Sequence, residues 1–423
     1  KGFRLNVKQY EELRVEINDD AIFKTYVHPY LGGSDLTKVP KKQWVIDLYG
    51  HDLADVRTQA SPLVQWIERH VKPDRDVNRR EKYRSFWWLF GEPRESLRQA
   101  LEGLDRYIAT TETSKHRFFQ FLEGDIVPDN MITAIASDDG YVLGILSSRV
   151  HIVWSLAAGG RQGVGNDPRY TKTRCFDPFP FPTPDDDLVQ KIREKAEELE
   201  DHRRSVQVKD PKLLTMTNMY NVLERIRAID AGEDPTPLSK KETRIMNGGE
   251  IDTRLQALHD ELDQLVFDAY GLSLYEVDEN DQLLIDEDGK PVPISDASIL
   301  THIVKLNALR IAEEKSGLVR WLRPDFQNPN GQEEKEASQD MLALDIDDLE
   351  DTPFVEVPFP EDAQERARLL KRRVKEHPGC VLEDFYAMFS SRMTKNRKKL
   401  VAQTLEALAT TGTIVQVNNS QWY

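Results

Sequence analysis

A glycine-rich, positively charged segment carries the residues best suited to bind a polyanion. Its flexible glycines are Gly159, Gly160, Gly163 and Gly165, and its other notable side chains are Arg161, Gln162, Arg169, Tyr170, Lys172 and Arg174. Guanidinium and ammonium groups neutralise phosphates, whereas an amide or an aromatic ring can contact a base. We therefore predict that this segment binds double-stranded DNA.

A second group of hydrogen-bond donors lies between Thr110 and Arg117. Short hydroxyl side chains are followed there by Lys115, His116 and Arg117, and such donors can reach phosphates and base edges. No nucleophile stands at a recognisable spacing from His116, and a single histidine is more often structural than catalytic. We predict a DNA-binding role for these three residues.

A third group of cations, Lys395, Arg397 and Lys398, opens a predicted helix near the C-terminus. Helix N-termini and cations both favour phosphate. Helices expected at 362–376, 381–389 and 394–409, followed by a β-hairpin, have the layout of a winged helix. Because many winged helices bind proteins, DNA and a protein both remain open as partners of this part.

No catalytic, cofactor-binding or metal-binding residues are predicted in this chain. Asp167-Pro168-Arg169-Tyr170 is close to the motif with which amino methyltransferases hold the target amino group and stack a flipped base. However, Arg169 replaces the second proline of that motif, and no glycine-rich turn after a strand precedes it to admit S-adenosylmethionine. No Walker loop, metal-ligand cluster or nuclease pattern stands out either.

The elements that must position these groups change character along the chain. Apolar runs at 21–27, 43–48, 106–109 and 142–146 predict strands, with few helices before residue 66. An apolar helix is expected to lead into Gly159. After residue 184, apolar residues recur at helical spacing and predict helices at 185–206, 215–229, 250–270 and 295–314.

These elements predict an α+β protein in four parts. The first is a mixed α/β domain at 1–184, and the second is a helical domain at 185–330 with an inserted hairpin near 275–293 around Asp288-Gly289. An acidic linker at 331–360 and a small winged-helix-like domain at 361–423 follow.

The net charge of −16 over 423 residues, from 57 Lys plus Arg and 73 Asp plus Glu, would argue against nucleic acid if it were evenly spread. Many of the acids crowd between Glu333 and Asp362 instead. No apolar run approaches the roughly 18 residues that a membrane span requires, and the two cysteines, far apart in sequence, suit a reducing compartment. We expect a cytoplasmic protein with no membrane partner.

Several short motifs, in a distinctive order, resemble the part downstream of catalysis in large class I DNA adenine-N6 methyltransferases. They span residues 1 to about 327 and include Tyr30-Leu31-Gly32-Gly33-Ser34-Asp35, Trp87-Trp88-Leu89-Phe90-Gly91, Ser114-Lys115-His116-Arg117, the Gly165–Pro182 block and Leu318-Val319-Arg320-Trp321. The resembling enzymes are the MmeI-like restriction-modification proteins and the methyltransferases of DISARM and BREX phage defence.

This resemblance implies a target recognition domain followed by a helical region, with the S-adenosylmethionine and catalytic motifs before Lys1. We therefore expect DNA sequence recognition on behalf of a bacterial site-specific methyltransferase, by a chain that is inactive alone. The alternative is a protein-interaction scaffold that docks another subunit of a defence complex.

Overall fold

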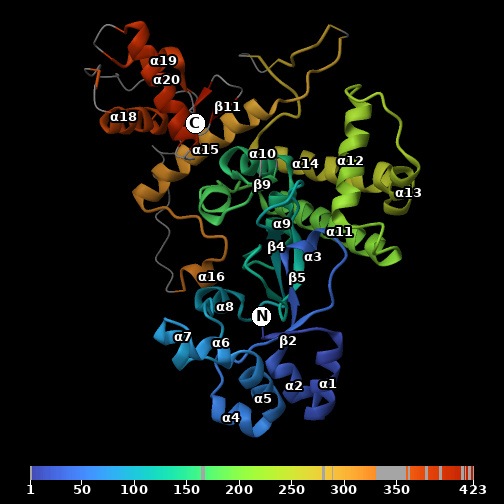
Figure 1. Cartoon of the computed structure of the whole chain (residues 1–423). Coiled ribbons are helices and arrows are strands. Elements are labelled where there is room, and N and C mark those ends of the chain that lie inside the picture. Colours follow the sequence, from blue (N-terminus) through green and yellow to red (C-terminus); the bar gives the residue numbers. More distant parts are fainter. Residues whose placement is uncertain are drawn as a thin grey trace. The chain divides into compact units, whose positions relative to one another are not determined.

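The computed structural model (Figure 1) describes residues 2–162, 167–278, 282–287, 289–329, 359–360, 363–376, 380–389, 393–410, 414, 416–417 and 421–422. Its contacts divide the chain into two compact units, and both are discontinuous in sequence. Unit 1 comprises Lys1–Leu143 and Arg193–Asp260, and unit 2 comprises Gly144–Ile192 and Glu261–Tyr423.

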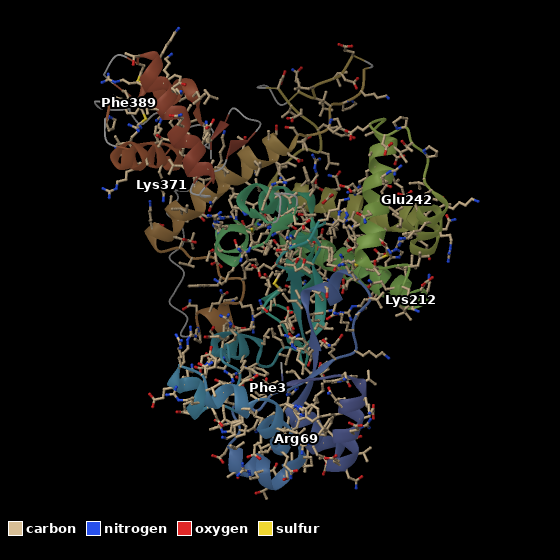
Figure 2. The ribbon with its side chains drawn as sticks, in the orientation of Figure 1. Phe3, Arg69, Lys212, Glu242, Lys371 and Phe389 are labelled. Carbon is tan, nitrogen blue, oxygen red and sulfur yellow. The ribbon has the colours of Figure 1, made fainter. Side chains whose placement is uncertain are left out.

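Unit 1 begins with a four-stranded sheet in the order β1-β3-β2-β6. Its strands are β1 (Arg4–Leu5), β3 (Trp44–Ile46), β2 (Val27–Leu31) and β6 (Val127–Pro128). The first three pair antiparallel, and β6 pairs parallel to β2. The core beside this sheet contains Phe3, labelled in Figure 2, with Phe23, Ile46, Leu63 and Ile67.

Short helices surround this sheet, so the expectation of few helices before residue 66 was wrong. They are α1 (Val7–Ile17), α2 (Asp20–Tyr26), α3 (Gly33–Thr37), α4 (Leu53–Gln59), α5 (Ser61–His70), α6 (Lys72–Asp76), α7 (Glu81–Ser85) and α8 (Glu95–Leu101). The strand predicted at 21–27 is mostly α2, because the Asp19 carboxylate caps its first turn by accepting from the amides of Ala21 and Ile22, both at 3.0 Å.

A second sheet of unit 1 has the order β5-β4-β7. It comprises β5 (Gln120–Glu123), β4 (Arg106–Thr111) and β7 (Ile132–Ile135). The central strand β4 pairs antiparallel with both neighbours and is buried from Tyr107 to Thr111. The strand predicted at 106–109 is therefore confirmed.

The strand predicted at 142–146 is instead helix α9 (Gly140–Ser147). Asp139 caps this helix by accepting from the Tyr141 amide at 2.9 Å, and Arg193 holds the same carboxylate at 2.6 Å. An apolar run this short fits either a buried strand or a buried helix, so local pattern could not distinguish them.

The helices predicted after residue 184 are confirmed. They are α11 (Asp186–Lys209), α12 (Met216–Asp230), the π-helical turn η2 (Ile251–Leu255) continued by α14 (Gln256–Tyr270), and α15 (Asp296–Ser316); α13 (Lys240–Gly249) and α16 (Pro324–Gln327) were not predicted. Between α14 and α15, an antiparallel bridge joins Ile285 to Pro291, as expected for the inserted hairpin.

The C-terminal part of unit 2 has the predicted order of three helices and a hairpin. It comprises α18 (Ala363–Glu376), β10 (Cys380–Val381), α19 (Leu382–Ala387), α20 (Lys395–Thr410), β11 (Gln416–Val417) and β12 (Gln421–Trp422). Its core contains Leu370, Phe385, Val401 and Trp422, with Phe389 (Figure 2). The α+β class is confirmed, and the four-part division stays a prediction because its acidic linker lies almost wholly outside the described residues.

Within the described ranges, no single helix has both the length and the apolar character of a membrane span. Helix α9 and helix α10 (Arg149–Ala158) meet those criteria only as a pair, and they are bent by 62° relative to each other.

Candidate nucleic-acid interface

The glycine-rich cationic segment starts with two paired β-strands. Helix α10 leads into β8 (Gly160–Gln162), which pairs antiparallel with β9 (Asp167–Arg169), so that Arg161 lies opposite Pro168. Because side chains alternate between the two faces of a strand, Arg161 and Arg169 lie on opposite faces of this hairpin. Both side chains are exposed. The side chain of Gln162 and residues 163–166 lie outside the described part.

Close packing requires a glycine where α10 meets this hairpin. A Cβ at Gly159 would lie 2.6 Å from the carbonyl oxygens of Arg169 and Ser155. Any residue can adopt the φ of −72° that Gly159 has. A side chain is therefore excluded at Gly159 by its close contact with backbone atoms and not by the backbone conformation. The neighbouring Gly160 would meet nothing within 4 Å.

Tyr170 anchors the hairpin to α10. Its side chain is 1% exposed, and its hydroxyl lies 3.0 Å from Nε2 of the buried His151. The His151 ring also packs edge-on against Phe179 at 4.3 Å. The side chain of Tyr170 is thus enclosed in this structure, and DNA contact by Tyr170 stays a prediction without an exposed side chain to support it.

The last two predicted cations of the segment lie in the π-helical turn η1 (Lys172–Phe176). Lys172 is exposed and donates to both carboxylate oxygens of Asp177, at 2.7 and 2.8 Å, whereas Arg174 is half-buried. Trp154 on α10 donates to the carbonyl of the buried Cys175 at 3.1 Å. This hydrogen bond holds η1 against α10, so the backbone that carries Lys172 and Arg174 is fixed in place.

The 114–117 segment connects β4 to β5 and is held against α12. Lys115 Nζ donates to Glu224 Oε2 at 2.6 Å and to Asn221 Oδ1 at 3.0 Å. His116 Nε2 lies 2.8 Å from the same Asn221 oxygen, and burial lowers the pKa of His116. The ring is therefore neutral at pH 7, with Nε2 protonated toward Asn221.

Arg117 faces the interior instead of the surface. It is 5% exposed, and its Nη1 donates to Thr110 Oγ1 at 3.0 Å and to the Thr111 carbonyl. Its guanidinium is bonded to buried groups of β4 in this structure, so the DNA-binding role predicted for Arg117 stays a prediction without an exposed side chain to support it.

The three C-terminal cations lie on the first turn of α20. Lys395 and Lys398 are exposed, and Arg397 is half-buried. The Arg397 guanidinium lies 4.9 Å from the centre of the Phe359 ring, and Lys398 Nζ lies 4.7 Å from that of Tyr386. Such cation–π contacts restrict the movement of the two side chains but do not neutralise their positive charges.

The Asp167-Pro168-Arg169 part of the methyltransferase-like motif is an extended strand, β9. Among the described residues, no group of three or more His, Cys, Asp or Glu is placed to hold a metal ion. What the described segments offer is therefore exposed cations on anchored turns.

Comparison with known proteins identifies the N-terminal part of the chain. Residues 2–183 match the family model described as the MmeI target recognition domain. The N-terminal part of the chain is therefore similar to a target recognition domain of this kind.

Two individual proteins are also similar. DNA methyltransferase A of Bacillus subtilis (strain 168) is 32% identical over 98 residues, which cover 22% of this chain and 10% of that protein. A solved structure of the type IIL restriction-modification enzyme MmeI in complex with DNA has a TM-score of 0.48 and 17% identity, and the match covers 72% of this chain and 33% of that one. The chain thus spans a minor part of both proteins.

Sequence reasoning missed the residues that join this recognition domain to the helices of unit 1. Arg203 on α11 is 1% exposed and donates to Glu200 at 2.6 Å, to the Phe119 carbonyl at 2.7 Å and to the Tyr220 hydroxyl at 3.0 Å. Glu200 in turn accepts from the Phe121 amide at 3.2 Å. A charged pair three residues apart on a helix is usually a surface feature, so nothing local marked this one as buried.

Proposed function

We propose that the chain recognises a DNA sequence on behalf of a bacterial MmeI-like restriction-modification methyltransferase. The match of residues 2–183 to the MmeI target recognition domain carries this proposal. The exposed cations on the β8–β9 hairpin, on η1 and on the 114–117 segment support it, since phosphate contacts supply most of the affinity of DNA-binding proteins.

The hairpin suits a DNA groove in a specific way. A two-stranded β-ribbon fits the major groove, where each base pair presents a distinct donor and acceptor pattern. Because Arg161 and Arg169 lie on opposite faces of the hairpin, one can face base edges while the other faces the backbone. We propose this division of roles, with Lys172 on phosphate.

The chemistry of the whole enzyme is part of the same proposal. We propose that an upstream part of the parent protein binds S-adenosylmethionine and methylates adenine at N6, while this chain holds and selects the duplex. The parent would act in restriction-modification or phage defence.

The direct test is the salt dependence of duplex binding by the purified chain, measured by fluorescence anisotropy. Each phosphate contact contributes about 0.9 to the slope of log K against log salt. Arg161→Ala combined with Lys172→Ala should therefore weaken binding and lower the slope by roughly 0.9 if Arg161 faces base edges, or by roughly 1.8 if it faces the backbone. Lys8→Ala combined with Lys24→Ala removes two exposed charges from α1 and α2 and should leave both values unchanged. Equal effects of the two pairs would refute the assignment of the hairpin.

A second candidate function, docking of a partner protein, is favoured by the inserted hairpin. Val277, Leu283, Leu284 and Ile285 are all more than a third exposed there, and acidic residues outnumber basic ones from 276 to 290. Such a surface suits a basic, apolar protein segment better than DNA. If Leu284→Ser abolishes assembly with a defence-system subunit and leaves DNA affinity unchanged, both functions stand side by side.

A further inference from the structure

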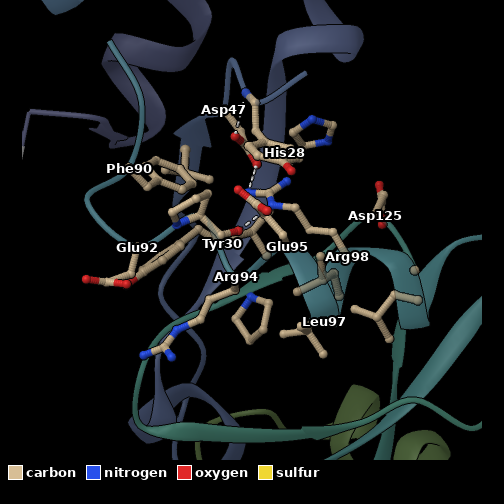
Figure 3. Close-up of a pocket in the computed structure, with 18 of the residues that line it drawn as sticks. His28, Tyr30, Asp47, Phe90, Glu92, Arg94, Glu95, Leu97, Arg98 and Asp125 are labelled. Carbon is tan, nitrogen blue, oxygen red and sulfur yellow. Dashed lines mark hydrogen bonds and ion pairs between the residues drawn. The ribbon is translucent and has the colours of Figure 1, made fainter. Parts of the chain in front are cut away.

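Unit 1 contains a cavity of about 700 Å³, and none of the predicted DNA-binding residues is among those that line it (Figure 3). Its floor is the sheet of β1, β2, β3 and β6, and its opposite wall is α8 with the turn before it. The residues that line it include Arg4, His28, Tyr30, Tyr49, Phe90, Leu97 and Arg98. Cavities that bind small organic ligands have volumes of about 300 to 1,000 Å³, so this one is of the right size.

A guanidinium is fixed at the wall of this cavity. Arg98 Nη2 donates to Asp47 Oδ2 at 2.7 Å, and its Nε donates to the Pro93 carbonyl at 2.7 Å. Asp47 is itself buried and accepts from the Tyr49 amide at 3.1 Å. The guanidinium carbon lies 4.6 Å from the centre of the Tyr49 ring. A planar cation held at two edges is preorganised to offer its remaining donors and its face.

Aromatic faces and a hydrogen-bond acceptor line the same space. The guanidinium of Arg4 lies 4.7 Å from the centre of the Tyr30 ring, and Phe90 lines the cavity beside them. Burial lowers the pKa of His28, whose ring also bonds to the Thr25 backbone. His28 is therefore neutral at pH 7, and its second ring nitrogen can accept a hydrogen bond.

The charge balance argues against a phosphate inside the cavity. The lining carries three arginines, Arg4, Arg94 and Arg98, against five carboxylates, Asp47, Glu92, Glu95, Glu102 and Asp125. Asp47 is neutralised by Arg98, and the remaining excess of acids repels a multiply charged anion. An uncharged ligand with both donors and acceptors meets no such penalty.

We propose that this cavity binds a single unpaired nucleobase with its sugar and leaves the phosphates outside. A nucleobase is planar, stacks on aromatic and guanidinium faces, and presents donors and acceptors on one edge. The Tyr30 and Tyr49 rings and the Arg98 guanidinium provide faces for stacking. The Arg98 guanidinium also provides hydrogen-bond donors, and the His28 ring provides an acceptor. A free nucleoside and an unpaired nucleotide in DNA share this chemistry, and only the second source rests on the DNA-binding function proposed above.

The first experiment titrates the whole chain with deoxynucleosides and with their 5′-monophosphates by isothermal titration calorimetry. At least one deoxynucleoside should bind with a Kd on the order of 1 mM or tighter, and its monophosphate should bind no more tightly. Leu97→Trp, which fills the cavity from α8, should weaken binding about tenfold or more. Val77→Trp, at an 82% exposed position outside the cavity lining, is the matched control, and thermal melting verifies that both variants fold.

Absence of nucleoside binding at 5 mM, about five times the expected Kd, would overturn the proposal. So would a monophosphate that binds about tenfold more tightly than its nucleoside, or equal affinities of the two tryptophan variants.

A second experiment separates the two sources. A duplex with a one-nucleotide bulge should bind more tightly than the same duplex fully paired, and Leu97→Trp should remove that difference. If nucleosides bind but the bulge gives no gain, the ligand is a free nucleoside. If neither duplex binds while nucleosides do, the DNA-binding function fails and the cavity assignment stands.

Discussion

Arg203 offers the sharpest test of how the helices hold the recognition domain. Arg203→Met keeps much of the apolar length of the side chain and removes the donors to Glu200, Phe119 and Tyr220. Loss of one partner of a buried ion pair costs about 3 to 5 kcal/mol, because the other charge stays buried. Arg204 still donates to Glu200 at 2.9 Å, so we expect the lower end, about 3 kcal/mol.

Hydrogen exchange of the peptide around β5 measures this loss locally. The amide of Phe121 is bonded to Glu200, and a loss of about 3 kcal/mol should speed its exchange on the order of 100-fold under conditions where the opening equilibrium governs exchange. Arg227→Met is the matched control. Arg227 donates to Asp260 at 2.8 Å from a side chain that is 44% exposed, and such an exposed pair contributes at most about 1 kcal/mol.

The double variant Arg203→Met with Glu200→Met extends the same test. Replacement of both charges by apolar side chains should cost less than Arg203→Met alone, since no uncompensated carboxylate is left. Unchanged exchange at β5 in Arg203→Met, or a larger effect in Arg227→Met, would refute the view that this network holds β5.

Two further predictions concern stability. Gly159→Ala forces a Cβ to 2.6 Å from two backbone oxygens and should destabilise the protein by about 1 to 3 kcal/mol in thermal melting, whereas Gly160→Ala should have little effect; equal losses would contradict the packing argument. Burial lowers the pKa of His259 in the folded protein well below its usual value. Below the unfolded-state pKa of about 6.5, the unfolded chain therefore binds a proton that the folded chain does not. The free energy of unfolding should decrease as the pH is lowered through this range, by up to about 1.4 kcal/mol per pH unit. Urea unfolding between pH 7.5 and 5 should show this slope, and His259→Gln should flatten it; an unchanged slope would exclude His259 as its source.

The long helices α11, α12, α14 and α15 could be predicted because their apolar residues repeat over several turns. Leu255, Leu258 and Leu262 are all fully buried, as the stripe at helical spacing predicts. The runs at 21–27 and 142–146 are too short for such a repeat. Their helices depend on the Asp19 and Asp139 caps, and a single aspartate is a weaker signal than a run of apolar residues.

The candidate site was predicted at the level of segments and less well at the level of side chains. Composition marked the hairpin and the 114–117 segment, and the exposed Lys115, Arg161 and Lys172 fit the prediction. Arg117 is a cation like these three, and Tyr170 has a ring that could contact a base, but both side chains are buried. Arg117 is oriented by its hydrogen bond to Thr110, and Tyr170 by its hydrogen bond to His151. Both contacts arise from the packing of the folded chain, so residue type alone could not predict which way these side chains point.

The claim that this chain recognises a DNA sequence is tested most directly by selection from a library of randomised duplexes with the purified chain. We expect enrichment of one sequence motif, and loss of that enrichment in the variant that combines Arg161→Ala with Lys172→Ala. Recovery of an unenriched library after repeated rounds, at a salt concentration where the chain binds duplex DNA, would contradict it.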